Sequence, residues 1–183
     1  MRKLIKKIEG KLDYWKRTLS IFYWSPNFSS IELMNPLGLT FKEVNIKDGL
    51  ASYLFDKDLK KEYEQRLNNG DVLCLLEDKG KIACYGWVNK SGIHNFGELD
   101  VVVQYNKSKE VLYDFFTDVE YRGKGLYPSL LICICQRNSN VKIGYSFPEN
   151  TSSVKGLNKG GFKFICNVTG FGKNKIQKVL NSL

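Results

Sequence analysis

A short basic loop between an apolar segment and an amphipathic segment is the feature that most constrains this chain. Residues 111–117 are almost continuously apolar and aromatic, which is typical of a strand buried on both faces. After the loop, apolar side chains recur at the helical positions i, i+3, i+4 and i+7, namely Tyr127, Leu130, Leu131 and Ile134. Pro128 fits the first turn of that helix, where a missing N–H is tolerated. The sequence therefore predicts a strand, a tight loop and a helix in direct succession.

The loop combines two positively charged residues with two glycines. Arg122 and Lys124 alternate with Gly123 and Gly125 just before the predicted helix. The first turn of a helix has unpaired N–H groups and a partial positive charge, and glycines let a ligand approach the backbone closely. These properties predict a site for a phosphate or pyrophosphate group. The alternative is an ordinary strand-to-helix connection with two exposed basic side chains.

The same residues resemble the pyrophosphate loop of the GNAT superfamily of acyl-CoA-dependent N-acetyltransferases. Residues 122–127 read Arg-Gly-Lys-Gly-Leu-Tyr, and the family pattern is Gln/Arg-x-x-Gly-x-Gly/Ala. Arg122 and Gly125 match this pattern, whereas Tyr127 stands where the family has a small residue. The patterns of a P-loop and of a dinucleotide fingerprint are both absent.

A second stretch strengthens the resemblance. Asn150-x-x-Ser153 is followed by a short predicted helix and then by Gly161-Phe162, an order that is common in the family. The resemblance therefore covers roughly residues 39–168. It implies an α/β (α+β) fold in which a mixed, mostly antiparallel central sheet is flanked by helices.

Residues 1–38 are predicted to form an N-terminal amphipathic helix and a connector, followed by the acetyltransferase domain at residues 39–183. Over residues 1–24, apolar side chains recur at three- and four-residue steps: Ile8, Leu12, Trp15, Leu19 and Phe22. Three roles stay open for this helix: packing on the domain, packing on a second subunit in a homodimer, or lying on a membrane surface. Proline and glycine among polar residues make residues 25–38 a connector.

Periodicity and turn residues predict alternating strands and helices within the domain. Strands are expected at residues 39–45, 72–76, 82–88, 99–105, 111–117, 141–147 and 162–168. Helices are expected within residues 50–67, from the basic loop to about residue 138, and at residues 151–159. Two hairpins are expected, 72–76 with 82–88 and 99–105 with 111–117. Residues 91–97 are expected to be a loop, and the tail from residue 173 a strand or a helical turn.

The resemblance implies that acetyl-CoA is the co-substrate. Main-chain groups of Phe115 and Thr117 are expected to bind the pantetheine arm and to stabilise the oxyanion that forms from the thioester carbonyl. The pyrophosphate is expected near Arg122, on the main-chain amides of Gly123, Lys124, Gly125, Leu126 and Tyr127. Asn150 and Ser153 are expected to face the same molecule.

The implied reaction is direct attack by the neutral amine of a small molecule, such as an amino sugar or another metabolite. It requires a base for the ammonium proton and an acid for the leaving thiolate. Many family members use a tyrosine as that acid, but the matching position here is Leu157. Asp114, Tyr145 and Glu98 are the candidate catalytic residues. Each also has a structural alternative: a satisfied hydrogen bond, a half-buried strand tyrosine and a solvated edge residue, respectively.

Other side chains are weaker candidates. Glu149 either caps a helix or acts in catalysis, and His94 either covers the acceptor pocket or is simply exposed in a loop. The last group of candidates either forms an aromatic wall for the acceptor or packs in the core. It consists of Trp87, Tyr85 and Tyr113.

Composition restricts the other classes of function. Five cysteines without a Cys-x-x-Cys pair, together with one histidine, predict reduced core thiols in a cytoplasmic protein and no metal site. The formal charge of +9 suits an anionic partner, but the basic residues are not interleaved with aromatic ones, so nucleic acid is not expected. Neither a signal peptide nor a membrane span of roughly 20 apolar residues is expected. The missing tyrosine motivates one rival, a non-catalytic CoA-binding or regulatory module, and a basic nucleic-acid-binding protein is the weaker third alternative.

Overall fold

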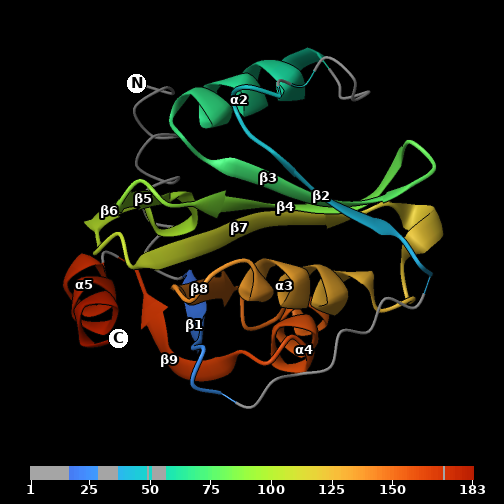
Figure 1. The fold of residues 1–183 in the computed structure, drawn as a ribbon. Helices are drawn as coiled ribbons and strands as arrows, with labels where there is room; N and C mark the ends of the chain where they lie inside the picture. The colour runs from blue at the N-terminus through green and yellow to red at the C-terminus, as the bar shows by residue number, and fades with distance from the viewer. Residues whose placement is uncertain (1–16, 29–36, 49, 51–56, 171) are drawn as a thin grey trace, which may run out of the picture.

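One seven-stranded sheet with helices on both faces forms the centre of the computed structural model, which describes residues 17–28, 37–48, 50, 57–170 and 172–183 (Figure 1). The strand order is β2-β3-β4-β7-β8-β1-β9, and neighbouring strands are antiparallel except β7 and β8. The strands of this sheet are β1 Thr18–Trp24, β2 Thr40–Val44, β3 Val72–Asp78, β4 Lys81–Asn89, β7 Lys109–Thr117, β8 Val141–Ser146 and β9 Lys163–Thr169. The other elements are α2 Lys57–Asn68, β5 Ile93–Phe96, η1 Gly97–Leu99, β6 Val101–Gln104, η2 Val119–Tyr121, α3 Leu126–Gln136, α4 Thr151–Lys159 and α5 Lys173–Ser182. The predicted mixed, mostly antiparallel sheet flanked by helices is confirmed.

The two faces of the sheet carry different elements. On one face, α3 and α4 pack on side chains such as Leu76 and Leu112. On the opposite face, α2 packs on Leu73 and Leu75 at one end of the sheet, and α5 with the β5–β6 pair packs on Ile21 towards the other end. Neighbouring residues of one strand therefore contact different helices, as the period-two geometry of a strand requires. No helix in these described segments is long and apolar enough to cross a bilayer.

The parallel strands β7 and β8 separate part-way along their length. They pair only from Lys109 with Val141 to Leu112 with Gly144. Beyond that point β7 continues to Thr117 and β8 to Ser146 without pairing to each other. The main-chain groups on the facing edges of both strands are thus left without strand partners across the opening, and these groups are able to bind an extended ligand.

A β-bulge lies in β7 beside this opening. Two residues of β7, Asp114 and Phe115, lie opposite the single residue Gly86 of β4. Asp114 has a φ of 50°, in the left-handed region that few non-glycine residues adopt. A Cβ added at Gly86 would overlap the ring of Phe115, so glycine is what allows the bulge to pack here.

The helix predicted over residues 1–24 is wrong at its C-terminal end. Residues 1–16 lie outside the described part of the chain, but Thr18–Trp24 is strand β1, paired with both β8 and β9 inside the sheet. Leu19 and Ile21 are buried on one face of the sheet and Phe22 on the other. The period is therefore two, and the helical spacing that includes Leu19 and Phe22 is coincidental because a buried run of β-branched and aromatic residues fits a central strand better.

The predicted pairing around residues 91–105 also needs correction. Residues 93–96, expected in a loop, form β5, and β5 pairs with β6. The segment predicted at 99–105 therefore does not pair with 111–117, since β7 lies between β4 and β8. The side chains of β5 and β6 alternate between buried and exposed, which is the pattern of a strand pair with one face packed on the core. The hairpin of β3 and β4 and helix α4 are confirmed, and the tail forms helix α5.

Candidate functional site

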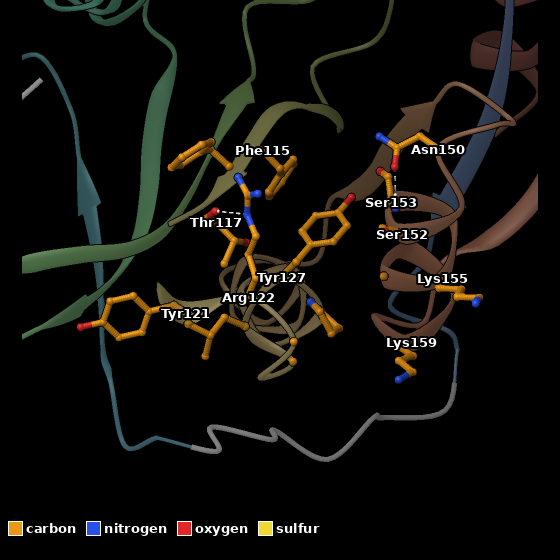
Figure 2. Close-up of a pocket in the computed structure, with 16 residues that line it drawn as sticks. Phe115, Thr117, Tyr121, Arg122, Tyr127, Asn150, Ser152, Ser153, Lys155 and Lys159 are labelled. Atoms are coloured by element: carbon orange, nitrogen blue, oxygen red, sulfur yellow. Dashed lines mark hydrogen bonds between the residues drawn. The ribbon is translucent and has the colours of Figure 1, made fainter. Parts of the chain in front are cut away.

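A pocket of about 790 Å³, the first pocket, lies where the end of β7, the basic loop and α4 meet (Figure 2). All predicted acetyl-CoA-binding residues except Lys124 line it: Phe115, Thr117, Arg122, Gly123, Gly125, Leu126, Tyr127, Asn150 and Ser153. Residues that are up to 38 positions apart in the chain, from Phe115 to Ser153, thus share one cavity. Lys124 instead places its ammonium group 5.3 Å from the ring centre of Tyr121.

Local hydrogen bonds fix the shape of the basic loop. The Nε–H of Arg122 donates to the carbonyl oxygen of Thr117 over 3.1 Å, which ties the loop to the end of β7. Gly123 and Gly125 both have a φ of 76°, a left-handed conformation for which glycine is favoured. Gly125 is the N-cap residue of α3, and its carbonyl oxygen accepts a hydrogen bond from Oγ of Ser129 over 2.9 Å. The start of α3, with its free N–H groups and partial positive charge, therefore faces the first pocket.

The charge of the first pocket is positive. Its basic lining residues are Arg122, Lys155 and Lys159, and none of the described residues that line it is acidic. Lys155 and Lys159 were missed in the sequence, although their i, i+4 spacing on a predicted helix places both on one face. Such a pocket favours an anionic ligand by direct electrostatic attraction.

Helix α4 begins with a side-chain cap at the first pocket. Oδ1 of Asn150 accepts a hydrogen bond from the backbone N–H of Ser153 over 3.1 Å (Figure 2). Asn150 therefore is the N-cap residue, and the capping role considered for Glu149 belongs to its neighbour. The cap orients the first turn of α4, so that Ser152 and Ser153 line the cavity.

A second pocket, of about 1150 Å³, contains all three predicted catalytic residues. Asp114, Tyr145 and Glu98 line it together with residues of α2, β5 and η1. Three aromatic side chains were predicted either to form a wall for the acceptor or to pack in the core, and the structure divides them between these two positions. Tyr85 and Tyr113 line the second pocket, whereas Trp87 is fully buried behind it.

Arg66 of α2 organises one wall of the second pocket. Its guanidinium group is 2.5 Å from Oδ2 of Asp114 and 2.5 Å from Oε1 of Glu62. The same group lies within about 5 Å of three ring centres, those of Tyr63, Trp87 and Tyr113. The ion pair holds the Asp114 carboxylate in place, which agrees with the structural alternative considered for this residue.

Glu98 is the carboxylate of the second pocket that is best suited to receive a ligand cation. Among the ion pairs of the described segments, none includes Glu98. Burial raises the pKa of Glu98 above its usual value, and the nearby charge of Asp114 acts in the same direction. A hydrogen bond from its own backbone N–H and the positive charge of Arg17 oppose this shift only in part. A raised pKa makes a carboxylate a stronger base, and an ammonium group would regain the electrostatic stabilisation that burial removes.

His94 is not the exposed loop residue that was one expectation from the sequence. It is only 5% exposed, on strand β5, and its Nε2 lies 3.1 Å from the hydroxyl oxygen of Tyr145. Burial, reinforced by the positive charge of Arg66, lowers the pKa of His94 to about 4. Burial also raises the pKa of Tyr145 well above its usual value. Both groups are therefore neutral near pH 7 and joined in one hydrogen bond.

The linings of the two pockets include neighbouring residues at the bulge in β7. Asp114 lines the second pocket and the next residue, Phe115, lines the first. Tyr145 lies in β8 just beyond Gly144, the last residue that pairs with β7. The opening between the two strands thus lies between a basic pocket and a pocket rich in carboxylates and hydroxyl groups.

Similar solved structures share this architecture, although no protein-family model and no curated protein matches the sequence. An acetyltransferase of the GNAT family from Colwellia psychrerythraea aligns with 89% of this chain and 59% of its own, with a TM-score of 0.58 and 13% identity. A GCN5-related N-acetyltransferase from Sphaerobacter thermophilus aligns with 91% of this chain and 54% of its own, with a TM-score of 0.52 and 10% identity.

This chain has the GNAT fold. A functionally unknown conserved protein from Staphylococcus epidermidis also shares it, with a TM-score of 0.57, 12% identity, and coverage of 91% of this chain and 65% of its own. The chain therefore spans less than two thirds of the length of each of these three structures. The resemblance inferred from the loop is confirmed at the level of the fold.

Within the GNAT fold, the position at which many members carry a catalytic tyrosine has no hydroxyl group here. Leu157 is 1% exposed and packs in the core beside Gly144 and Phe162. One tyrosine that lines the first pocket is Tyr127, whose ring centre is 5.0 Å from that of Phe115 and whose hydroxyl group bonds the side chain of Ser153. Burial raises the pKa of Tyr127 to about 12.

Proposed function

We propose that this protein is an acetyl-CoA-dependent N-acetyltransferase that acts on the amine of a small molecule in the cytoplasm. The observation that carries the proposal is that consecutive residues of β7 line two pockets of different charge, beside the split between β7 and β8. The first pocket has basic residues and no described acidic one, whereas the second contains Glu62, Asp71, Glu98 and Asp114 against Arg17 and Arg66. An anionic acyl carrier and a cationic acceptor match these two environments.

The lining of the first pocket fits acetyl-CoA. The backbone at Gly123 and Gly125 leaves open space where a side chain would be, since a Cβ added at either position meets no atom within 4 Å. The start of α3, with Arg122 and the α4 lysines, would hold the pyrophosphate. The free edge of β7 at Phe115 and Thr117 would hold the pantetheine arm through main-chain hydrogen bonds. Acetyl-CoA, when bound, supplies the acetyl group as a thioester.

The second pocket supplies the proton transfers. Glu98 takes one proton from the acceptor's ammonium group, and the resulting amine forms the new C–N bond. The C–S bond then breaks, and Tyr145 donates its phenol proton to the sulfur. The phenolate of Tyr145 takes the second proton from the nitrogen, which restores the tyrosine and leaves a neutral amide. Per turnover, one proton remains on Glu98 and passes to solvent. Asp114, which Arg66 already binds, orients the ammonium group instead of accepting its proton.

Two measurements test this proposal. Calorimetric titration of the folded protein with acetyl-CoA should show saturable binding, and a thiol-release assay over a panel of amines should show turnover with cationic, hydroxyl-rich acceptors such as amino sugars. Amines that also carry a carboxylate should be poorer acceptors, because the second pocket is acidic. An absence of acetyl-CoA binding would overturn the proposal.

The second candidate is a non-catalytic CoA-binding module, and Leu157 is the observation that favours it. This candidate predicts acetyl-CoA binding without thiol release from any amine in the panel. It also predicts that Glu98→Gln and Tyr145→Phe change neither acetyl-CoA binding nor thiol release and affect only local stability.

A further inference from the structure

We propose that His94 is a positioning residue for Tyr145: its Nε2–H donates to the phenol oxygen and directs the phenol proton towards the split between β7 and β8. The inference rests on the proposed acetyl transfer. It gives a role to the only histidine of the chain, which the sequence predicted either to cover the acceptor pocket or to be exposed in a loop.

Tyr145 is located where a proton donor is required. Its backbone pairs with Ile21 of β1 on one side, whereas its other edge faces the opening that begins after Gly144. Its side chain lines the second pocket, as do Glu98 and Asp114, and the charge of each of these two carboxylates acts on its hydroxyl group. The phenol thus lines the pocket proposed for the acceptor, beside the split between β7 and β8.

Aromatic rings hold His94 in one orientation. The ring of Phe96 stands at 90° to the imidazole with 4.8 Å between centres, and the ring of Tyr113 lies 4.9 Å away. Tyr113 is itself fixed, because its hydroxyl donates to Asp71 over 2.6 Å. A polar imidazole in such surroundings requires a hydrogen-bond partner, and the Tyr145 hydroxyl at 3.1 Å is that partner.

The tautomer of His94 determines which of the two side chains donates the hydrogen bond between them. If Tyr145 donated to His94, its proton would be directed away from the leaving sulfur. With the proton on Nε2, the imidazole donates instead, and the phenol proton is free to point into the pocket. The same N–H then stabilises the phenolate that forms when Tyr145 gives its proton to sulfur, until the phenolate accepts the second nitrogen proton. His94 stays neutral and gains or loses no proton in the cycle.

The first test is spectroscopic and needs no substrate. Because the chain has one histidine, a ¹⁵N-histidine spectrum contains the signals of His94 alone. The expected result at pH 7 is a neutral imidazole with the proton on Nε2, and a clear shift of the Nε2 signal in Tyr145→Phe. Tyr85→Phe removes a hydroxyl that lies in the same pocket but bonds Tyr63, so it should leave the Nε2 signal in place. A proton on Nδ1, or an Nε2 signal that does not shift in Tyr145→Phe, would overturn the inference.

The second test is kinetic. Tyr145→Phe should lower kcat about 100-fold, and His94→Leu about tenfold, as for the loss of one hydrogen bond in the transition state. The KM for acetyl-CoA should stay within about twofold, because neither residue lines the first pocket. His94→Gln, which keeps an N–H donor, should recover most of the loss. In the Tyr145→Phe background, His94→Leu should have no further effect on kcat.

The outcomes of these tests distinguish a failure of the role of His94 from a failure of the proposed acetyltransferase function. Suppose that the wild-type protein turns over and that His94→Leu and Tyr145→Phe lower kcat by independent factors that multiply in the double variant. This result overturns the role of His94 and leaves the acetyltransferase proposal standing. An intact spectroscopic coupling without turnover on any amine overturns the acetyltransferase proposal and reduces the pair to a structural contact. Thermal unfolding and calorimetric binding of acetyl-CoA by each variant identify any protein that fails to fold.

Discussion

The ring of Tyr127 occupies the space that Gly156 leaves open on α4. A Cβ added at Gly156 would overlap Cδ1 and Cε1 of that ring. Gly156→Ala should therefore destabilise the protein by about 1 kcal/mol, since overpacking costs roughly 1–3 kcal/mol and the better helix propensity of alanine returns about 1 kcal/mol. Displacement of the ring into the first pocket should also weaken acetyl-CoA binding. Urea unfolding and calorimetry measure the two effects.

The control for this prediction is the double variant Tyr127→Ala with Gly156→Ala. Without the ring, the added methyl group meets no obstacle from Tyr127, so the two substitutions should be strongly non-additive. Additive changes in the free energy of unfolding would show that the ring and the glycine do not determine each other's position.

Gly125 allows a direct test of the basic loop, with Gly80 as a matched control. Both glycines have a left-handed φ, 76° and 92°, and a Cβ meets nothing within 4 Å at either position. Substitution by valine should thus impose a similar backbone strain of about 1–2 kcal/mol in the two variants. Only Gly125→Val alters the first pocket, so only this variant should lose acetyl-CoA affinity, by at least about tenfold. Equal affinities in a calorimetric titration would show that the loop is merely a bend.

The local parts of this site could be predicted from the sequence because their signals are local. The loop from Arg122 to Gly125 and the capped helix that begins after Asn150 are each encoded within a few consecutive residues. Turn glycines, a side-chain cap and short-range periodicity depend little on the rest of the chain. The position of Leu157 also follows from its spacing within this helix.

The parts that depend on strand pairing could not be predicted in the same way. Residues 18–24 form a strand because β8 and β9 lie on either side of them, and nothing near them in the sequence identifies these partners. The burial of His94 depends equally on the β5–β6 pair and on Tyr145, which is 51 residues away. Tyr145 and Glu98 were candidates from the sequence and His94 was a weaker one, but no signal near His94 in the chain indicates its burial or its hydrogen bond with Tyr145.

Lys155 and Lys159 are expected to contribute long-range attraction to the first pocket. The double variant Lys155→Ala with Lys159→Ala should lower acetyl-CoA affinity about tenfold at low salt and reduce the dependence of affinity on salt, because exposed charges are screened. Lys173→Ala with Lys178→Ala, on α5, removes the same number of charges from exposed positions outside the pocket lining. If both double variants bind acetyl-CoA equally, net charge alone explains the attraction.

Arg66 should be important for the stability of the second pocket. Arg66→Ala leaves the carboxylate of Asp114 without its ion-pair partner and removes a cation from three aromatic rings. Breaking a fully buried ion pair costs roughly 3–5 kcal/mol, but Asp114 is partly exposed, so about 2 kcal/mol is expected. Arg66→Lys should recover only part of this loss, because lysine keeps the charge but cannot bind two carboxylates through a planar group. Urea unfolding at pH 7 measures both variants, and a fully stable Arg66→Ala protein would contradict the prediction.

His94 should make the stability of the protein depend on pH between about 4 and 6.5. Its pKa in the folded protein is lowered to about 4 from an ordinary value of 6.5, so between these values the unfolded chain binds the proton and the folded protein does not. The stability linked to neutral His94 is therefore complete above about pH 6.5 and is lost as the pH falls towards 4. The shift corresponds to about 3 kcal/mol in total, at about 1.4 kcal/mol for each pH unit.

The measurement compares the free energy of unfolding of the wild-type protein and of His94→Leu across this range. Carboxylates titrate in the same range in both proteins, so their contributions cancel in the difference between the two curves. The wild-type protein should lose stability relative to the variant as the pH falls from about 6.5 to 4, and the difference should be constant above pH 7. A flat difference across the whole range would show that the folded protein does not hold this imidazole in its neutral form.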